Sequence, residues 1–194
     1  MQQEVKPGLE NNDEILDRIA TGLYNLAAML VGEGETSAEL VEQTVSSSEV
    51  KLCCCPIEAR KSSKRVLSGL ALRVLAERDP ESLRAPEGPA PAGVCIEEDD
   101  LEEAGFTYEQ IESIFSGPER GRVRTWLEGL KPTVRIVFVL RAVACLTAAE
   151  ASRLLKINGG KFSMSWTPEA VRECFRQGLC SLASQIFHAA PKEA

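Results

Sequence analysis

Residues 132–155 read PTVRIVFVLRAVACLTAAEASRLL, and this stretch is the strongest indication of the fold. Pro132 suits the first position of a helix, where the missing backbone N–H has no cost. The run 134–145 is apolar on nearly all sides, which is typical of a helix buried between other helices. Thr147 and Glu150 then have the spacing of a capping box, which predicts that a second, short helix begins here.

The chain after this stretch predicts a turn and a final helix. Residues 156–166 contain Asn158-Gly159-Gly160, a turn signal that also fits a small hairpin. Thr167 is then suited to cap a last helix with Pro168 at its first position. The apolar side chains of that helix recur at helical spacing, and they are Val171, Phe175, Leu179, Leu182 and Ile186.

The chain before this stretch predicts further helices and a linker. Apolar residues at helical spacing predict helices over 14–31, from about 37, over 57–78 and over 123–130. Prolines, glycines and acidic residues between them predict a linker with a short helix at 108–115. We therefore expect an all-α protein with two helical domains, 1–79 and 122–194, joined by an acidic linker, 80–121.

Composition and charge indicate which partners and which cell compartment to expect. The 194 residues carry a net charge of −7, and ten acidic residues without a basic one fall within 87–119. The segments on either side are mildly basic, and such segments are compatible with a nucleic-acid partner. No apolar stretch has the roughly 18 residues of a membrane helix, and the N-terminus lacks the features of a secretory signal. We expect a cytoplasmic protein with no membrane partner.

The cysteines and the single histidine give no indication of a catalytic or metal site. Seven cysteines without a C-x-x-C pair, and His188 alone, do not match a structural zinc site. We expect reduced and mostly buried thiols, with no metal and no cofactor. The alternative is that Cys53, Cys54 and Cys55 form an exposed reactive cluster. The sequence has no glycine-rich phosphate loop and no H-E-x-x-H motif, so we do not expect an enzyme.

Residues 127–155, residues 167–172 and the segment from 23–27 through 40–44 together resemble one family, the extracytoplasmic-function sigma factors. Residues 127–155 resemble the start of the family's region four, which reads as a leucine-proline start, an arginine, V-F-x-L-R and then G-L-T-x-x-E-I-A-x-x-L. Residues 167–172, TPEAVR, resemble the start of its recognition helix. Residues 23–27, LYNLA, through 40–44, LVEQT, are similar to the L-Y-x-L-A and D-L-V-Q-E-T-F helices of region two. The stretches occur in the family's order, and the resemblance implies a sigma factor that binds core RNA polymerase and promoter DNA, with an anti-sigma factor as a further candidate partner.

The resemblance also implies where those partners bind. The region-two helix that docks on polymerase corresponds here to Glu39, Leu40, Val41, Glu42, Gln43 and Thr44. A capped helix, a turn and a second capped helix would form a helix-turn-helix that reads the major groove. The candidate DNA contacts on or beside the second helix are Arg172, Arg176, Thr167, Glu169, Lys161 and Arg153. A basic cluster on the third predicted helix adds Arg60, Lys61, Lys64 and Arg65 as phosphate contacts.

The departures from the family support a second hypothesis. Acidic and uncharged residues, Glu173 among them, replace much of the basic character of a recognition helix, and eleven residues separate Leu155 from Thr167. Between Tyr24 and Phe106 there is no aromatic residue on which a flipped base could stack. The alternative is a degenerate sigma-like module that engages polymerase or an anti-sigma factor without melting DNA. Each basic or acidic cluster also fits an ordinary solvated helix face.

Overall fold

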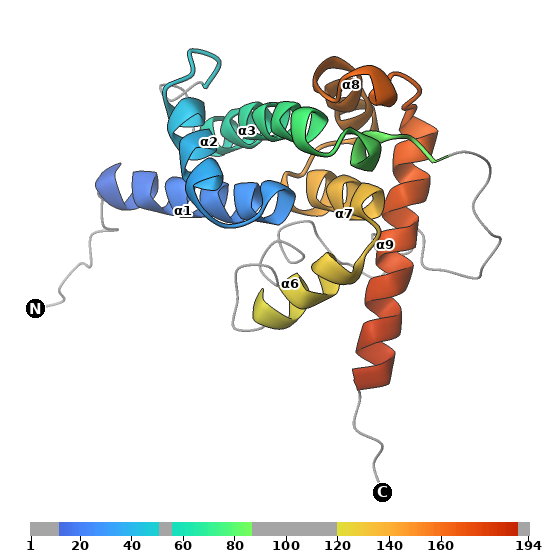
Figure 1. Cartoon of the computed structure of the whole chain (residues 1–194). Coiled ribbons are helices and arrows are strands. Elements are labelled where there is room, and N and C mark those ends of the chain that lie inside the picture. Colours follow the sequence, from blue (N-terminus) through green and yellow to red (C-terminus); the bar gives the residue numbers. More distant parts are fainter. Residues whose placement is uncertain (1–11, 51–55, 87–119, 190–194) are drawn as a thin grey trace, which may run out of the picture.

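The described part of the structure, a computed structural model, covers residues 12–50, 56–86 and 120–189, and its regular elements are all helices (Figure 1). The prediction of an all-α protein is confirmed for these residues. In chain order the elements are α1 (Asn12–Val31), α2 (Glu35–Val45), α3 (Pro56–Arg78), η1 (Pro80–Leu83), α6 (Arg120–Gly129), α7 (Pro132–Phe138), η2 (Val139–Val143), α8 (Ala148–Asn158), η3 (Lys161–Ser163) and α9 (Pro168–Ala189).

The sequence located most of these helices within a few residues, and two features differ. The buried run 134–145 is not one regular helix, because α7 continues as the π-helical turn η2 and ends near Cys145, whose φ is 57°. The hairpin at 158–160 is wrong, since the 3-10 turn η3 follows, with Gly160 at φ 71°. The Ser163 hydroxyl donates to the Gly160 carbonyl at 2.8 Å and holds this turn. The predicted helix at 108–115 lies outside the described residues.

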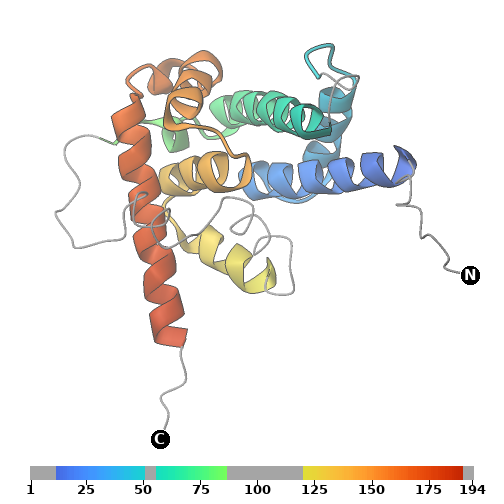
Figure 2. The same ribbon diagram turned by 180° about the vertical axis from the view of Figure 1, so that it is seen from behind.

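One hydrophobic core runs through both predicted halves of the chain. It joins α1 and α3 side chains such as Leu26 and Leu72 to α7 and α9 side chains such as Phe138 and Phe175, all of them fully buried. Figures 1 and 2 agree that α3 lies beside α8, although the two are far apart in the sequence. The division into two domains stays a prediction, and the described residues of both halves pack as one body.

Phe138 is at the centre of the contact between α7 and α9. Its ring meets the Trp126 ring edge-on at 5.0 Å and the Phe175 ring at 5.3 Å. Gly178 of α9 is buried directly against Phe138, so α9 approaches α7 closely at this point. As predicted, the buried face of α9 includes Val171, Phe175 and Leu179.

The cysteines follow the prediction only in part. Cys174 is a buried free thiol, and burial raises its pKa to about 12, with a smaller effect from the neighbouring charge of Glu173. Cys145 is half-buried, and its thiol donates to the Val143 carbonyl at 3.7 Å. Cys180 is disulfide-bonded, so the expectation of reduced thiols is wrong for this residue, which is only half-buried on α9.

None of the helices in the described ranges is long and apolar enough to cross a membrane.

Candidate functional site

The helices α8 and α9 are both capped at their N-termini, as the sequence predicts. The Thr147 backbone N–H donates to the Glu150 carboxylate at 2.9 Å, and the Glu150 N–H donates to the Thr147 hydroxyl at 3.2 Å. Thr167 accepts a hydrogen bond from the backbone N–H of Ala170 at 3.2 Å. Residues 159–167, which include η3, connect the two helices. The elements of a helix-turn-helix are therefore present in the predicted order.

Both arginines of the predicted recognition helix have acidic partners on α9. Arg172 is exposed, and its Nη1 lies 3.5 Å from the Glu169 carboxylate. Arg176 is half-buried and binds Glu173 through Nη2 at 2.8 Å and Nε at 3.1 Å. The hydrogen bond from Arg176 is the main reason that the pKa of Glu173 lies below its usual value. A phosphate would have to replace or join these carboxylates.

Three of the four basic residues predicted on α3 are exposed, namely Arg60, Lys61 and Arg65. Lys64 is 5% exposed, and its ammonium donates to the Val143 carbonyl at 2.9 Å. Lys64 therefore does not belong to an exposed phosphate-binding cluster, because its face of α3 packs on the second half of the chain.

The N-terminus of α8 lies close to this basic face of α3. Burial opposes ionisation of Glu150, but hydrogen bonds from Thr147 and the charges of Lys61 and Arg65 outweigh it and lower the pKa. The structure thus brings Lys61 and Arg65 of α3 near the start of the helix-turn-helix. Part of their positive charge is balanced there by Glu150.

The two remaining basic candidates, Arg153 and Lys161, are both exposed. Arg153 lies on α8. The Lys161 ammonium lies 4.8 Å from the centre of the Phe162 ring, and the Arg84 guanidinium lies at the same distance from that ring. Arg84 in turn pairs with Glu81 at 2.9 Å. Lys161 therefore belongs to a mixed-charge group with η1.

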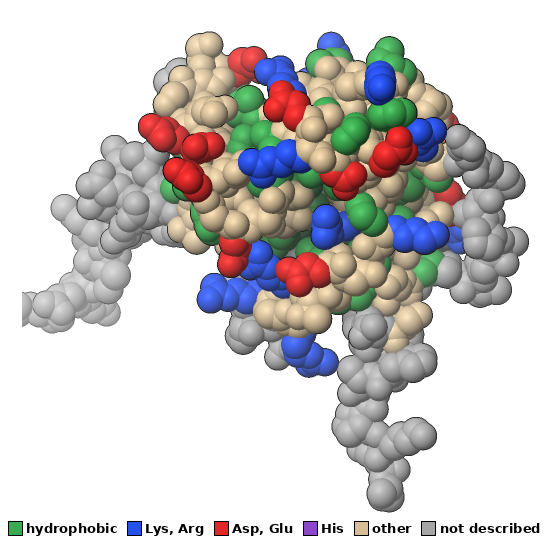
Figure 3. Space-filling model, in the orientation of Figure 1, with side chains coloured by type: hydrophobic (Ala, Val, Ile, Leu, Met, Phe, Trp, Pro, Cys, Tyr) green, Lys and Arg blue, Asp and Glu red, His purple; other side chains and the backbone are tan. Residues whose placement is uncertain are grey.

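The predicted polymerase-binding helix, α2, exposes half of its candidate residues. Glu39, Glu42 and Gln43 are exposed and Val41 is half-buried. Acidic side chains gather over α2 in Figure 3. In contrast, Leu40 and Thr44 are buried, with exposed fractions of 3% and 0%. These two residues face the core, so an external partner would meet only the acidic side of α2.

One cavity of about 300 Å³ is lined by three arginines that the sequence does not group, Arg78, Arg124 and Arg135. They come from α3, α6 and α7. No local motif joins them, since only the packing of the two halves brings them together. The only available signal was the arginine of the region-four resemblance, Arg135, which the sequence left without a role.

Comparison of the chain with protein-family models, with curated proteins and with solved structures finds no match. Within the described ranges, no three histidine, cysteine or acidic side chains are grouped as metal ligands.

Proposed function

We propose that this chain is a sigma-like transcription factor of the extracytoplasmic-function type, which binds core RNA polymerase and promoter DNA to direct initiation. The observation that carries the proposal is the capped pair α8 and α9, with Arg172 exposed on the first turns of the second helix. In a helix-turn-helix, residues at this end of the second helix contact bases in the major groove. An arginine there is suited to guanine edges or to phosphates.

The acidic side of α2 is the proposed polymerase contact. Glu39, Glu42 and Gln43 are exposed on one element, so they offer carboxylates and an amide to a basic surface. Buried Leu40 and Thr44 anchor α2 to the core, and the Thr44 hydroxyl donates to the Leu40 carbonyl at 2.7 Å. The protein itself would supply no chemistry, because polymerisation belongs to the polymerase.

A second candidate function has its own support, from the single core. A factor that reads two promoter elements has to present two DNA-binding units, whereas here α3 and α8 pack against each other. Arg172 and Arg176 are paired with glutamates, and Lys64 is buried. These observations favour a sigma-like binding module that engages polymerase or an anti-sigma factor without melting DNA.

One binding experiment separates these functions. A labelled library of genomic DNA fragments is titrated with the protein at several salt concentrations, with and without core polymerase, and anisotropy is measured. For a sigma factor, affinity falls steeply with salt, and each lost phosphate contact lowers the slope by about one. Arg172→Met should weaken DNA binding, while Arg120→Met, an exposed arginine on α6, should not.

Polymerase binding is tested separately by charge reversal. Glu39→Lys with Glu42→Lys should abolish binding to core polymerase, and Glu77→Lys on α3 is the matched control. Polymerase binding without DNA binding would favour the second function. Absence of both interactions at low salt would contradict both proposals.

A further inference from the structure

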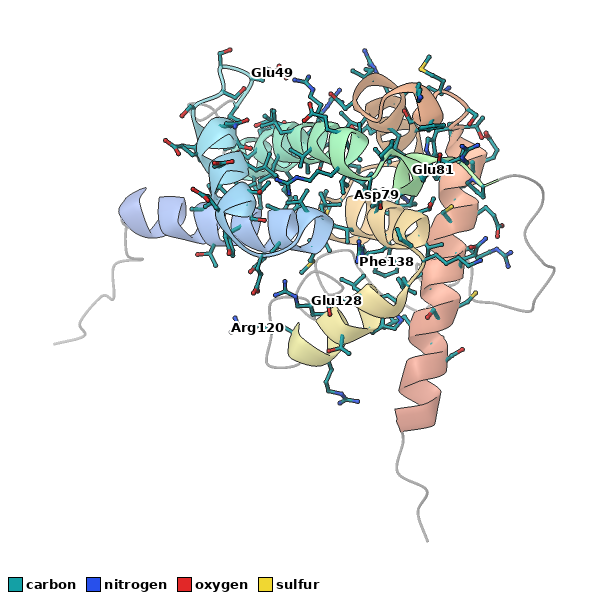
Figure 4. All side chains as sticks on the ribbon, viewed as in Figure 1. Glu49, Asp79, Glu81, Arg120, Glu128 and Phe138 are labelled. Atoms are coloured by element: carbon teal, nitrogen blue, oxygen red, sulfur yellow. The ribbon has the colours of Figure 1, made fainter. Side chains whose placement is uncertain are left out.

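The cavity lined by Arg78, Arg124 and Arg135, here called the arginine pocket, lies between the two halves of the chain. Its first-half walls are the end of α1 with the following Gly32, residues 28–32, and the α3 residues Leu75 and Arg78. Its second-half walls come from α6 and from Arg135 of α7. Figure 4 labels Glu128, the acidic residue of this wall, on α6. The cavity has about 300 Å³, at the lower end of the range for small-molecule sites.

Two of the three arginines have partners. Arg124 pairs with Glu33 through Nη1 and with Glu128 at 3.3 Å, and its pKa is raised chiefly by the hydrogen bond to Glu33. Arg78 donates to the Thr36 hydroxyl at 2.8 Å, which is a neutral partner. Three positive charges on one cavity are thus offset by two carboxylates.

Arg135 is different, because its half-buried side chain makes no hydrogen bond or ion pair with any residue of the described ranges, and its Nε is buried without a partner. A buried donor that has lost its water and has no acceptor is unfavourable, and more so on a charged group. Arg141, whose Nε is also unpaired, donates through Nη1 to the Leu146 carbonyl and does not line the pocket. Arg135 therefore lacks an acceptor at a place where the cavity has room for one.

We propose that the arginine pocket binds a small molecule that carries an oxyanion, a phosphate or a carboxylate, on a short apolar body. The guanidinium of Arg135 would hold the oxyanion through its parallel N–H groups, the geometry that suits both kinds of anion. Arg78 adds a second positive charge. The apolar wall, with Leu75, Leu127 and Met29, would contact the body of the ligand.

Such a ligand would contact both halves of the chain at once. Because it would bind only the packed arrangement, it would stabilise the single core against separation. The site is independent of the proposed function, since neither α2 nor α9 lines the pocket. A ligand that holds the two halves together would oppose the sigma-factor function, which has to present two DNA-binding units.

The test is a calorimetric titration of the full chain at low salt with phenyl phosphate, with benzoate and with neutral benzyl alcohol. We expect at least one anion to bind about tenfold more tightly than the alcohol, and the tighter anion identifies the oxyanion class. Arg135→Met should weaken that binding about tenfold or more, while Arg120→Met leaves it unchanged. If Arg135→Met does not fold, the second variant is Arg135→Lys, which keeps the positive charge but lacks the parallel N–H groups of a guanidinium. It should also weaken binding.

Three outcomes would overturn the proposal. The first is that neither anion binds the wild-type chain, and the second is that the alcohol binds as tightly as the anions. The third is that the folded Arg135 variants bind the tighter anion with the affinity of the wild type.

Discussion

The indole Nε1 of Trp166 donates a hydrogen bond to the backbone carbonyl of Leu83 at 2.8 Å, and both residues are fully buried. This bond joins Trp166, two positions before the start of α9, to the last residue of η1, and so connects the two halves of the chain. A buried carbonyl that loses its donor keeps its desolvation cost. The bond therefore contributes to keeping α9 and η1 together.

Trp166→Phe should lower the free energy of unfolding by about 1–3 kcal/mol, because it removes the donor and leaves a small void. Trp126→Phe is the matched control, since the Trp126 indole donates at 3.0 Å to Ser181, a residue that is only half-buried. Urea unfolding followed by circular dichroism measures both. Equal losses in the two variants would contradict a special role for the Trp166 bond.

Gly178→Ala should also destabilise the protein, although alanine normally favours a helix by about 1 kcal/mol over glycine. A Cβ at this position would lie 2.4 Å from the Phe138 ring, and that ring is held by Trp126 and Phe175. The clash should outweigh the helical gain and cost about 1–3 kcal/mol. Gly22→Ala on α1, with no atom within 4 Å of the new Cβ, should stabilise instead. Thermal unfolding compares the two, and a stabilised Gly178→Ala would show that α7 and α9 are less closely packed.

Local signals in the sequence were sufficient to locate the helices but not to predict which charged side chains are exposed. Apolar spacing located α1 and α3, and the Thr147 and Glu150 pattern located the start of α8, because both effects act within one or two turns. The sequence does not indicate that Lys64 is buried, since its acceptor, the Val143 carbonyl, is distant along the chain.

The arginine pocket was missed for the same reason. Arg78 and Arg135 lie on different helices, and only the packing of the two halves places them on one cavity. Two separate domains, as the sequence predicts them, would form no site between them. Long-range packing thus decides which of the charged residues are available to a partner.

Lys64→Met should separate stability from DNA binding. Because the ammonium is buried and donates to the Val143 carbonyl, its removal should lower stability by about 1–3 kcal/mol. It should leave DNA affinity unchanged, whereas Arg60→Met on the exposed side of α3 should weaken it. Urea unfolding and DNA anisotropy at low salt measure these effects. Loss of DNA affinity in folded Lys64→Met would mean that Lys64 leaves its buried position to bind phosphate.

Stability should depend on the ionisation of Glu173. Its pKa is held below the ordinary 4.5, first by the hydrogen bond from Arg176, so folding favours the charged carboxylate. The resulting stabilisation is present above the unfolded pKa and is lost as pH falls through the lower folded pKa. The stability difference between wild type and Glu173→Gln should therefore shrink as pH falls below 4.5. Urea midpoints across that range test this, and a difference that does not change with pH would contradict it.

The most direct test of the proposed function is transcription by purified core RNA polymerase on sheared genomic DNA, with this protein as the only added factor. Mapping the 5′ ends of the transcripts shows where initiation occurs. The sigma-factor account predicts start sites that share upstream sequence and exceed the background of core polymerase alone. Start sites no more frequent than that background would contradict it.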